Sequence, residues 1–273
     1  MKYSIITINF NNKDGLEKTI KSVLEQTFND YQYIIIDGGS TDGSADVIKK
    51  YTNDIDYWIS EPDNGIYDAM NKGIDNATGD YCIFMNSGDQ FYNDNVLYYF
   101  KSINHHEDII YGDVYNSETN KIMFSPPHKE ISLYYLYSST IPHQGAFIKT
   151  SLQKKHFYDD SLRIVADWKF FYESIIIDNC SIIHVNSPVC KFCPDGISTT
   201  NPDATWNEKK RVLQELLPHR ILQDYQWMKA SECQTMEILP DLRKHYKIDK
   251  LIFKISKILL GITKGIFLHN RNA

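Results

Sequence analysis

The feature that most constrains the fold is an alternation of strand-like and helix-like segments along the first ninety residues. Short runs of β-branched and aromatic residues predict strands at 3–8, 33–36, 57–60 and 81–85. Between them, apolar residues recur at helical spacing over 15–26 and over 66–77. A further helix, capped by Thr41 or Asp42, is expected to run to about Tyr51. This alternation predicts an α/β fold with a doubly wound, mostly parallel central sheet and helices on both faces.

A cluster of polar residues follows each predicted strand. The clusters lie at 9–12, 37–40, 63–65 and 86–89. Carboxyl ends of parallel strands share one edge of the sheet, so these loops are expected to converge on a single ligand. In the last cluster Asp89 stands beside Asn86, Ser87 and Gly88, a combination that suits a divalent cation holding phosphates. An ordinary polar turn after a strand is the alternative.

Composition narrows the choice of partners and compartment. A net charge of −6 argues against a general nucleic-acid binder. The five cysteines, an odd number, fit a reducing compartment, and the lone CxxC at 190–193 fits structural thiols better than a metal site. Neither a signal peptide nor a membrane-spanning run is expected, so we predict a cytoplasmic protein. The sequence holds neither GxGxxG nor GxxxxGK[ST], which disfavours dinucleotide and P-loop sites.

The pattern changes after Asp89. Strands are expected at 108–115, 121–124 and 142–148, followed by a helix at 167–175. A late strand pair is expected at 181–192, broken by Pro188, and a helix at 204–217.

Four motifs in the first half occur in a recognisable order. They are SIITINFN at 4–11, IDGGSTDGS at 36–44, NGIYDAMNKG at 64–73, and ATGD at 77–80 followed by NSGD at 86–89. In this order and spacing, the chain resembles the inverting nucleotide-sugar glycosyltransferases of family 2, which have the GT-A fold. The resemblance extends over about residues 3–198 and implies a catalytic domain at 1–217, with a nucleotide-binding half at 1–100 and an acceptor half at 101–217.

The resemblance implies roles for particular residues. Phe10 would flank the base, Asn9 would bond near it, and Asp37 would accept from base or ribose. Asp89 would bind the Mg²⁺ or Mn²⁺ that bridges the two phosphates and stabilises the leaving diphosphate. The full set expected at the nucleotide is Asn9, Phe10, Asp37, Asn64, Gly65, Asn71 and Ser87.

Three departures from the family pattern weaken those contacts. Gly38 replaces the second Asp of the usual pair, Asn86 and Gly88 stand where the metal motif has further carboxylates, and Met70 replaces a frequent Arg. They affect the base, metal and phosphate contacts, respectively. With Asp89 as the one strong carboxylate, metal binding is expected to rely on the phosphates as co-ligands.

An inverting transfer needs a base that takes the proton of the acceptor hydroxyl. The family places an Asp at the start of a late helix, and VADW at 165–168 matches with Ala166 in place of the usual Glu. The sequence therefore predicts Asp167 as the base, kept ionised by the positive helix end. A capping Asp without chemistry is the alternative, and Asp159 or Asp160 is the reserve candidate.

Two further side chains are expected on the acceptor side of the site, and one further segment is expected to close over the nucleotide. His143 is expected over the acceptor or the diphosphate, with a packed structural histidine as the alternative. Asp113 follows an apolar strand and is expected to line the acceptor side. The segment DGIS at 195–198 is expected to be a mobile loop that closes on the nucleotide.

Residues 218–273 are expected to form a helical extension. Within it, 247–269 carries an apolar stripe opposite a row of lysines, the pattern of a helix lying on an anionic membrane surface, which would place the protein on the inner face of the membrane. Docking on the catalytic domain or on a second subunit is the alternative.

The expected function is transfer of a hexosyl or N-acetylhexosaminyl group from a nucleoside diphosphate, with UDP favoured, to a cell-surface glycan or lipid-linked acceptor in polysaccharide biosynthesis. Two alternatives stay open: a sugar nucleotidyltransferase, and a non-catalytic nucleotide-sugar-binding partner of another transferase. The first would carry a Gly-rich basic loop near the N-terminus, which residues 9–14 do not provide.

Overall fold

The computed structural model describes residues 2–124, 131–193, 196 and 200–244. The chain divides into two compact units, Met1–Leu216 and Leu217–Ala273. The first unit holds the sheet and its helices; in the second, the described element is α10 (His219–Lys244).

The strands of the first unit are β1 (Tyr3–Asn9), β2 (Tyr31–Asp37), β3 (Tyr57–Ser60), β4 (Tyr81–Phe84), β5 (Gln90–Phe91), β6 (Ile109–Asn116), β7 (Ile122–Phe124), β8 (Ala146–Lys149) and β9 (Ile182–Phe192). Its helices are α1 (Lys13–Leu24), α2 (Ser44–Lys50), α3 (Ile66–Asn76), α4 (Val96–Ser102), α5 (Leu133–Ser138), α6 (Thr150–Lys155), α7 (Ala166–Tyr172) and α9 (Pro202–Leu216).

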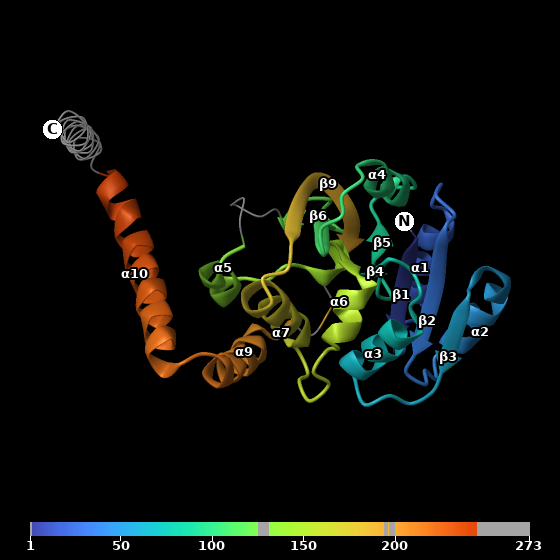
Figure 1. Ribbon diagram of the computed structural model, residues 1–273, viewed down its shortest axis with the longest axis horizontal. Coiled ribbons are helices and arrows are strands. Elements are labelled where there is room, and N and C mark those ends of the chain that lie inside the picture. The colour runs from blue at the N-terminus through green and yellow to red at the C-terminus, as the bar shows by residue number, and fades with distance from the viewer. Residues whose placement is uncertain (1, 125–130, 194–195, 197–199, 245–273) are drawn as a thin grey trace. The chain divides into compact units, whose positions relative to one another are not determined.

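These strands form one mixed sheet in the order β3-β2-β1-β4-β8-β6-β9-β5, with β7 paired to β6 (Figure 1). Strands β3, β2, β1 and β4 run parallel, as their connection through helices requires. From β4 onward the pairing is mostly antiparallel, with β6 and β9 parallel. The expected α/β architecture is confirmed, and its purely parallel part is the N-terminal half.

Alternate side chains of the parallel strands face two helical layers, because successive residues of a strand point to opposite faces. Tyr3 and Ile5 of β1 belong to a buried cluster with residues of α1, α2 and α4. On the other face α3 packs so closely on β1 that a Cβ on Gly73 would lie 2.4 Å from Ile6 Cγ2. Both faces are therefore covered, and ligands are confined to the sheet edge.

Two expectations about the second half were wrong in detail. Residues 142–148 do not form one strand: His143–Gly145 is a 3₁₀ turn closed by the Gly145 amide on the Pro142 carbonyl, and β8 starts at Ala146. Pro188 does not break the late strand pair, because β9 is continuous. Its partner there is Asp113, where the register shifts, and a proline without an N–H is tolerated at such an irregularity.

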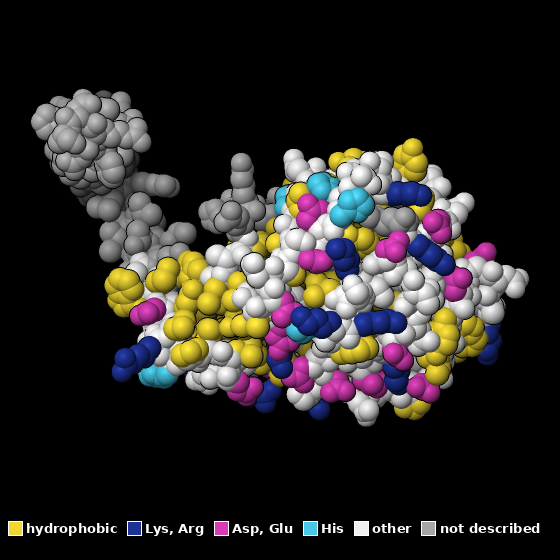
Figure 2. Space-filling model, viewed as in Figure 1, with side chains coloured by type: hydrophobic (Ala, Val, Ile, Leu, Met, Phe, Trp, Pro, Cys, Tyr) yellow, Lys and Arg dark blue, Asp and Glu magenta, His cyan; other side chains and the backbone are white. Residues whose placement is uncertain are grey.

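Two of the predicted segments cannot be compared with the structure. The amphipathic segment 247–269 and all of the 195–198 loop except Gly196 lie outside the described residues. None of the helices within the described ranges is long and apolar enough to cross a bilayer. On the face seen in Figure 2, basic and acidic side chains are interspersed rather than separated by sign.

Candidate active site

A cavity of about 830 Å³ opens at the carboxyl edge of the parallel strands. All four polar clusters that follow β1 to β4 contribute to it, so their predicted convergence is observed. The second half adds residues from the turn before β8, from the start of α7 and from the end of β9. The predicted site residues that line it are Asn9, Phe10, Asn64, Gly65, Ser87, Asp89, His143 and Asp167.

Asp37 was expected at the base or ribose, but its side chain does not line the cavity. It is fully buried and accepts hydrogen bonds from Asn9 Nδ2 at 2.7 Å, from the Ser40 amide at 3.0 Å, and from the Ser40 and Ser60 hydroxyls. These donors neutralise the cost of burying a carboxylate. Asp37 therefore orients Asn9 at the end of β1, and its predicted contact with the base or ribose stays a prediction.

Asn71 and Asp113 are also placed away from the cavity lining. The Asn71 amide ties α3 to the backbone of Tyr158, donating to its carbonyl at 2.8 Å and accepting from its N–H at 2.9 Å. Asp113 is buried and pairs with His184 Nε2 at 3.0 Å. The reserve candidates are elsewhere too: Asp159 pairs with Lys169 at 2.7 Å, and Asp160 is exposed outside the cavity lining.

Asp89 is held at the cavity by the turn that ends β4. Gly88 adopts φ +105°, a backbone conformation that favours glycine, and its N–H donates to Thr19 Oγ1 at 3.0 Å. The Thr19 hydroxyl in turn donates to the Asp89 carbonyl at 2.7 Å. One carboxylate oxygen of Asp89 accepts the Cys193 N–H at 3.0 Å, which links the turn to the end of β9. The carboxylate is thereby fixed rather than free to rotate.

Asp167 lies across the same cavity and accepts two side-chain hydrogen bonds. The Tyr67 hydroxyl donates to its Oδ1 at 3.2 Å, and His143 Nδ1 lies 3.1 Å from its Oδ2. Asn86 Nδ2 lies 3.2 Å from His143 Nε2. An amide nitrogen can only donate, so Nε2 accepts and Nδ1–H donates to Asp167. Burial, and then the charge of Asp167, raise the pKa of Tyr67 well above its ordinary value, so this phenol stays a donor.

Helix α9 fixes the segment that carries Asp167. The Glu208 carboxylate accepts the backbone N–H groups of residues 163, 164 and 165 at 3.0, 2.7 and 3.0 Å. The next residue, Ala166, begins α7, so an acidic side chain meets the positive end of that helix. Beside it, Lys209 donates to the Ser139 carbonyl at 2.8 Å and lies over the Trp168 ring. Burial lowers the pKa of Lys209 to about 7, against the opposing effect of Asp167.

The charged groups that line the cavity are mostly acidic. Among the described residues, the lining holds the carboxylates of Asp63, Asp89 and Asp167 and the guanidinium of Arg163. Asn86 Oδ1, also at the lining, is buried with no hydrogen-bond partner among the described residues. Within those residues, however, His, Cys, Asp and Glu side chains form no group of three that could hold a metal. A metal held by the described lining residues would therefore need further oxygen ligands, such as those of a bound phosphate.

Sequence reasoning missed several of these residues. Tyr67 lies inside the NGIYDAMNKG motif and Asp63 inside a predicted polar cluster, so a signal existed for both. Arg163 stands four residues before Asp167 and could have been noticed as a cation near the predicted base. Nothing in the sequence connects Glu208 to residues about 45 positions earlier, because that contact depends on how α9 packs.

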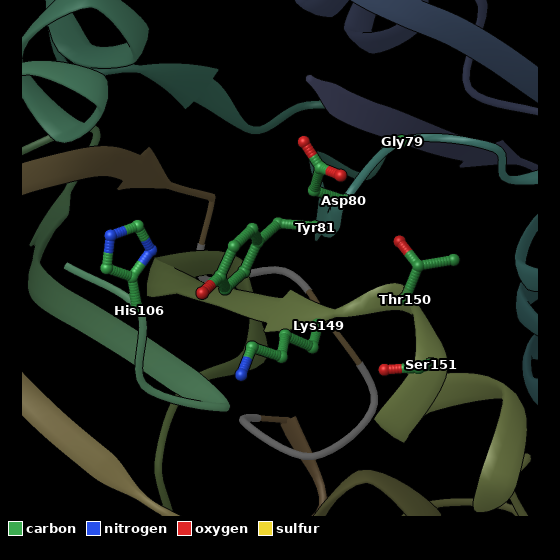
Figure 3. Close-up of a pocket in the computed structure, with 7 residues that line it drawn as sticks. All are labelled: Gly79, Asp80, Tyr81, His106, Lys149, Thr150 and Ser151. Atoms are coloured by element: carbon green, nitrogen blue, oxygen red, sulfur yellow. The ribbon is translucent and has the colours of Figure 1, made fainter. Parts of the chain in front are cut away.

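A second hollow, of about 600 Å³, lies at the opposite end of β4 (Figure 3). It is lined by Asp80, His106, Lys149 and neighbouring residues, and Lys149 is paired with Asp108 at 2.9 Å. It lies at the amino end of the parallel strand β4, the edge where open α/β sheets do not place their ligands. The cavity that holds Asp89 and Asp167 is therefore the candidate active site.

Comparison with known sequences identifies the family. The family model described as glycosyl transferase family 2 matches residues 4–163. A relative named as an uncharacterized glycosyltransferase of Mycobacterium tuberculosis (strain CDC 1551 / Oshkosh) is 30% identical over 217 residues. The matched segment covers 77% of this chain and 82% of the relative.

Solved structures show the same fold. Staphylococcus aureus TarS 1–349 in complex with UDP-GlcNAc matches with a TM-score of 0.63 and 18% identity, covering 76% of this chain and 64% of that chain, less than two thirds of its length. The mannosyltransferase PcManGT from Pyrobaculum calidifontis, in complex with GDP-Man and Mn²⁺, matches with a TM-score of 0.56 and 15% identity, covering 72% of this chain and 58% of that chain. The chain belongs to glycosyl transferase family 2 and is a transferase enzyme with the GT-A fold.

Proposed function

We propose that the protein is an inverting glycosyltransferase that uses a UDP-sugar as donor and a hydroxyl of a cell-surface glycan or lipid-linked glycan as acceptor. The observation that carries this proposal is that Asp89 and Asp167, remote in sequence, line one cavity. The TarS structure, which holds UDP-GlcNAc, supports UDP as the nucleotide.

In this proposal Asp167 is the general base. The acceptor oxygen attacks the anomeric carbon from the face opposite the diphosphate while its proton passes to the Asp167 carboxylate. The bond from the anomeric carbon to the diphosphate breaks, and UDP leaves. Tyr67 and His143 donate to the two oxygens of Asp167, so they hold its orientation towards the acceptor hydroxyl.

The nucleoside diphosphate is proposed to lie along the loops after β1, β2 and β4. Phe10 is 65% exposed at the cavity, so its ring is available to the base. Arg163, the one cationic side chain among the described lining residues, is suited to a phosphate or to the charge of the leaving group.

A divalent cation fits this site as part of a complex with the donor. Three carboxylates around the cavity would repel a diphosphate, and a cation would offset that repulsion. Asp89 and Asn86 Oδ1 would hold Mg²⁺ or Mn²⁺ together with phosphate oxygens, and the cation would supply charge neutralisation of the departing diphosphate. The Mn²⁺ in the PcManGT structure supports the same proposal.

The test compares wild type with Asp167→Asn. A panel of sugar nucleotides, each with Mg²⁺ or Mn²⁺, is screened for transfer or slow hydrolysis while the Kd for UDP is measured by calorimetry. We expect the variant to bind UDP within twofold of wild type and to lose transfer by about a thousandfold or more, the scale of losing an essential acid–base group. Asp160→Asn, which removes an exposed carboxylate outside the cavity, is the control. Transfer that survives in Asp167→Asn would overturn the assignment of the base.

A further inference from the structure

The turn after β2 has a glycine, Gly38, at a position whose side-chain space is filled by another residue. Gly38 lines the cavity, and its N–H donates to the Asn9 carbonyl at 2.9 Å. A Cβ added to Gly38 would lie 2.4 Å from Asp63 Oδ2 and 3.2 Å from Phe10 Cδ2. The carboxylate of Asp63, from the loop between β3 and α3, therefore occupies the space in which a side chain on residue 38 would begin.

The position of Asp63 is fixed by its own loop. Its Oδ1 accepts the Gly65 N–H at 2.9 Å. The residue before it, Pro62, packs against the turn after β2, because a Cβ on Gly39 would lie 3.0 Å from Pro62 N. The Glu61 N–H donates to the Asp37 carbonyl at 3.0 Å, so the start of the loop is tied to β2. Among the described residues, Asp63 Oδ2 has no hydrogen-bond donor. One carboxylate oxygen holds the loop, and the other is presented at the cavity.

The carboxylate stands next to an aromatic ring. Phe10 and Asp63 approach the same point above Gly38, both line the cavity, and the Phe10 ring is largely exposed. An exposed ring beside a fixed acceptor suits a flat heterocycle that carries an N–H donor at its edge. Uracil has such a ring N–H, whereas cytosine has a lone pair on the corresponding nitrogen, which a carboxylate repels.

We infer that Asp63 recognises the ring N–H of the donor's base and selects uridine over cytidine nucleotides. This inference rests on the proposed function, because it takes the cavity to bind a nucleoside diphosphate. It assigns the base contact to the β3–α3 loop, whereas Asp37 on β2 is buried and engaged.

The test measures the Kd of UDP and of CDP for the full-length protein by calorimetry in the presence of Mn²⁺. Wild type is expected to prefer UDP. Asp63→Asn is expected to weaken UDP binding by about ten- to a hundredfold, the range for losing a hydrogen bond to a charged group. CDP binding should be unchanged or tighter, because the amide can donate to the cytosine nitrogen that the carboxylate repels. If Asp63 had a merely structural role, its substitution would not change the ratio of the Kd values for CDP and UDP.

Asp68→Asn is the matched control, since Asp68 accepts the Asn64 N–H in the same loop and does not line the cavity. It should leave the preference for UDP unchanged. A second pair of variants exploits the shared space: Gly38→Asp alone is expected to abolish UDP binding by collision with Asp63, and Gly38→Asp with Asp63→Gly is expected to recover the preference for UDP.

Equal weakening of UDP and CDP by Asp63→Asn, or no weakening of either, would overturn the inference while leaving the proposed function standing. Wild type that binds no nucleotide would instead contradict the proposed function, and this inference with it.

Discussion

The two walls of the cavity are built differently. The wall proposed to bind the nucleotide, here called the nucleotide wall, is made of residues 8–10, 38–39, 62–67, 69–70, 86–87 and 89. It comes from the loops that follow the parallel strands and from the start of α3. The wall proposed to face the acceptor, here called the acceptor wall, is made of His143, Gln144, Arg163, Ile164 and Asp167. It depends on α9, whose Glu208 accepts three backbone N–H groups just before α7. Because the two walls are held by different contacts, donor binding and catalysis should respond to different mutations.

After the loss expected for Asp167→Asn, the next largest effect on transfer is expected from Asp89 in the nucleotide wall. Asp89→Asn removes the carboxylate proposed to hold the metal with the diphosphate, and we expect transfer to fall by about a hundred- to a thousandfold, as for loss of one preorganised electrostatic contact. The Kd for UDP should also rise in Mn²⁺, as calorimetry with and without the metal would measure. Asp80→Asn, at the other end of β4, is the control. Unchanged UDP binding in Mn²⁺ would remove Asp89 from the metal site.

A tenfold fall in kcat, without a change in UDP affinity, is expected from a substitution in α9. Glu208→Gln replaces one of the two accepting oxygens with an NH2 group, which cannot accept. At least one of the three backbone N–H groups then loses its acceptor, so the free energy of unfolding should fall by about 1–3 kcal/mol. Because the loosened segment carries Asp167, kcat should fall about tenfold while the Kd for UDP stays within twofold. Steady-state kinetics and urea unfolding check this, with the exposed Glu215→Gln on the same helix as control. Equal losses in kcat and UDP affinity would mean that the walls are not independent.

A smaller catalytic effect is expected from Tyr67→Phe. The substitution keeps the ring and removes one of the two donors that orient Asp167, so kcat should fall by a few-fold with the fold intact. Tyr98→Phe, at a 60% exposed tyrosine, is the matched control. If Tyr67→Phe retains full kcat, the hydrogen bond to Asp167 does not contribute to the reaction.

The smallest effect on activity is expected at Lys209, where the predicted change concerns stability alone. Burial lowers the pKa of Lys209 to about 7, below its unfolded value of 10.5. Between these two values the unfolded chain binds a proton that the folded chain does not, so stability should rise with pH across that window. Lys209→Met removes this slope, and its stabilising effect should be greatest near pH 7 and shrink towards pH 9. Urea unfolding at several pH values tests this against Lys210→Met, and parallel curves for wild type and Lys209→Met would contradict it.

The predictability of the site from the sequence follows the same division. Asn9, Phe10, Ser87 and Asp89 each stand near the end of a strand whose pattern is visible, so both their edge and their convergence could be predicted. The burial of Asp37 was not predicted, because it depends on hydrogen bonds from Ser40 and Ser60, which the strand pattern does not show. The place of Asp63 beside Phe10 depends on the space above Gly38 as well as on its own loop, and no pattern of residues reveals that space.

In the second half, sequence periodicity was a weaker guide. Asp167 was found through a family motif, but the residues that hold it come from α3, from the turn before β8 and from α9. The turn at His143 and the unbroken β9 are set by pairing with distant strands rather than by local propensity. Contacts of this kind exist only after the chain has folded.

The most direct test of the central claim is anomalous diffraction from a crystal grown with UDP and Mn²⁺. We expect an Mn²⁺ peak beside the Asp89 carboxylate, the uracil near Phe10, and the diphosphate ending in the part of the cavity that Asp167 lines. An Mn²⁺ peak away from Asp89, or a nucleotide bound in the hollow of Figure 3, would contradict it.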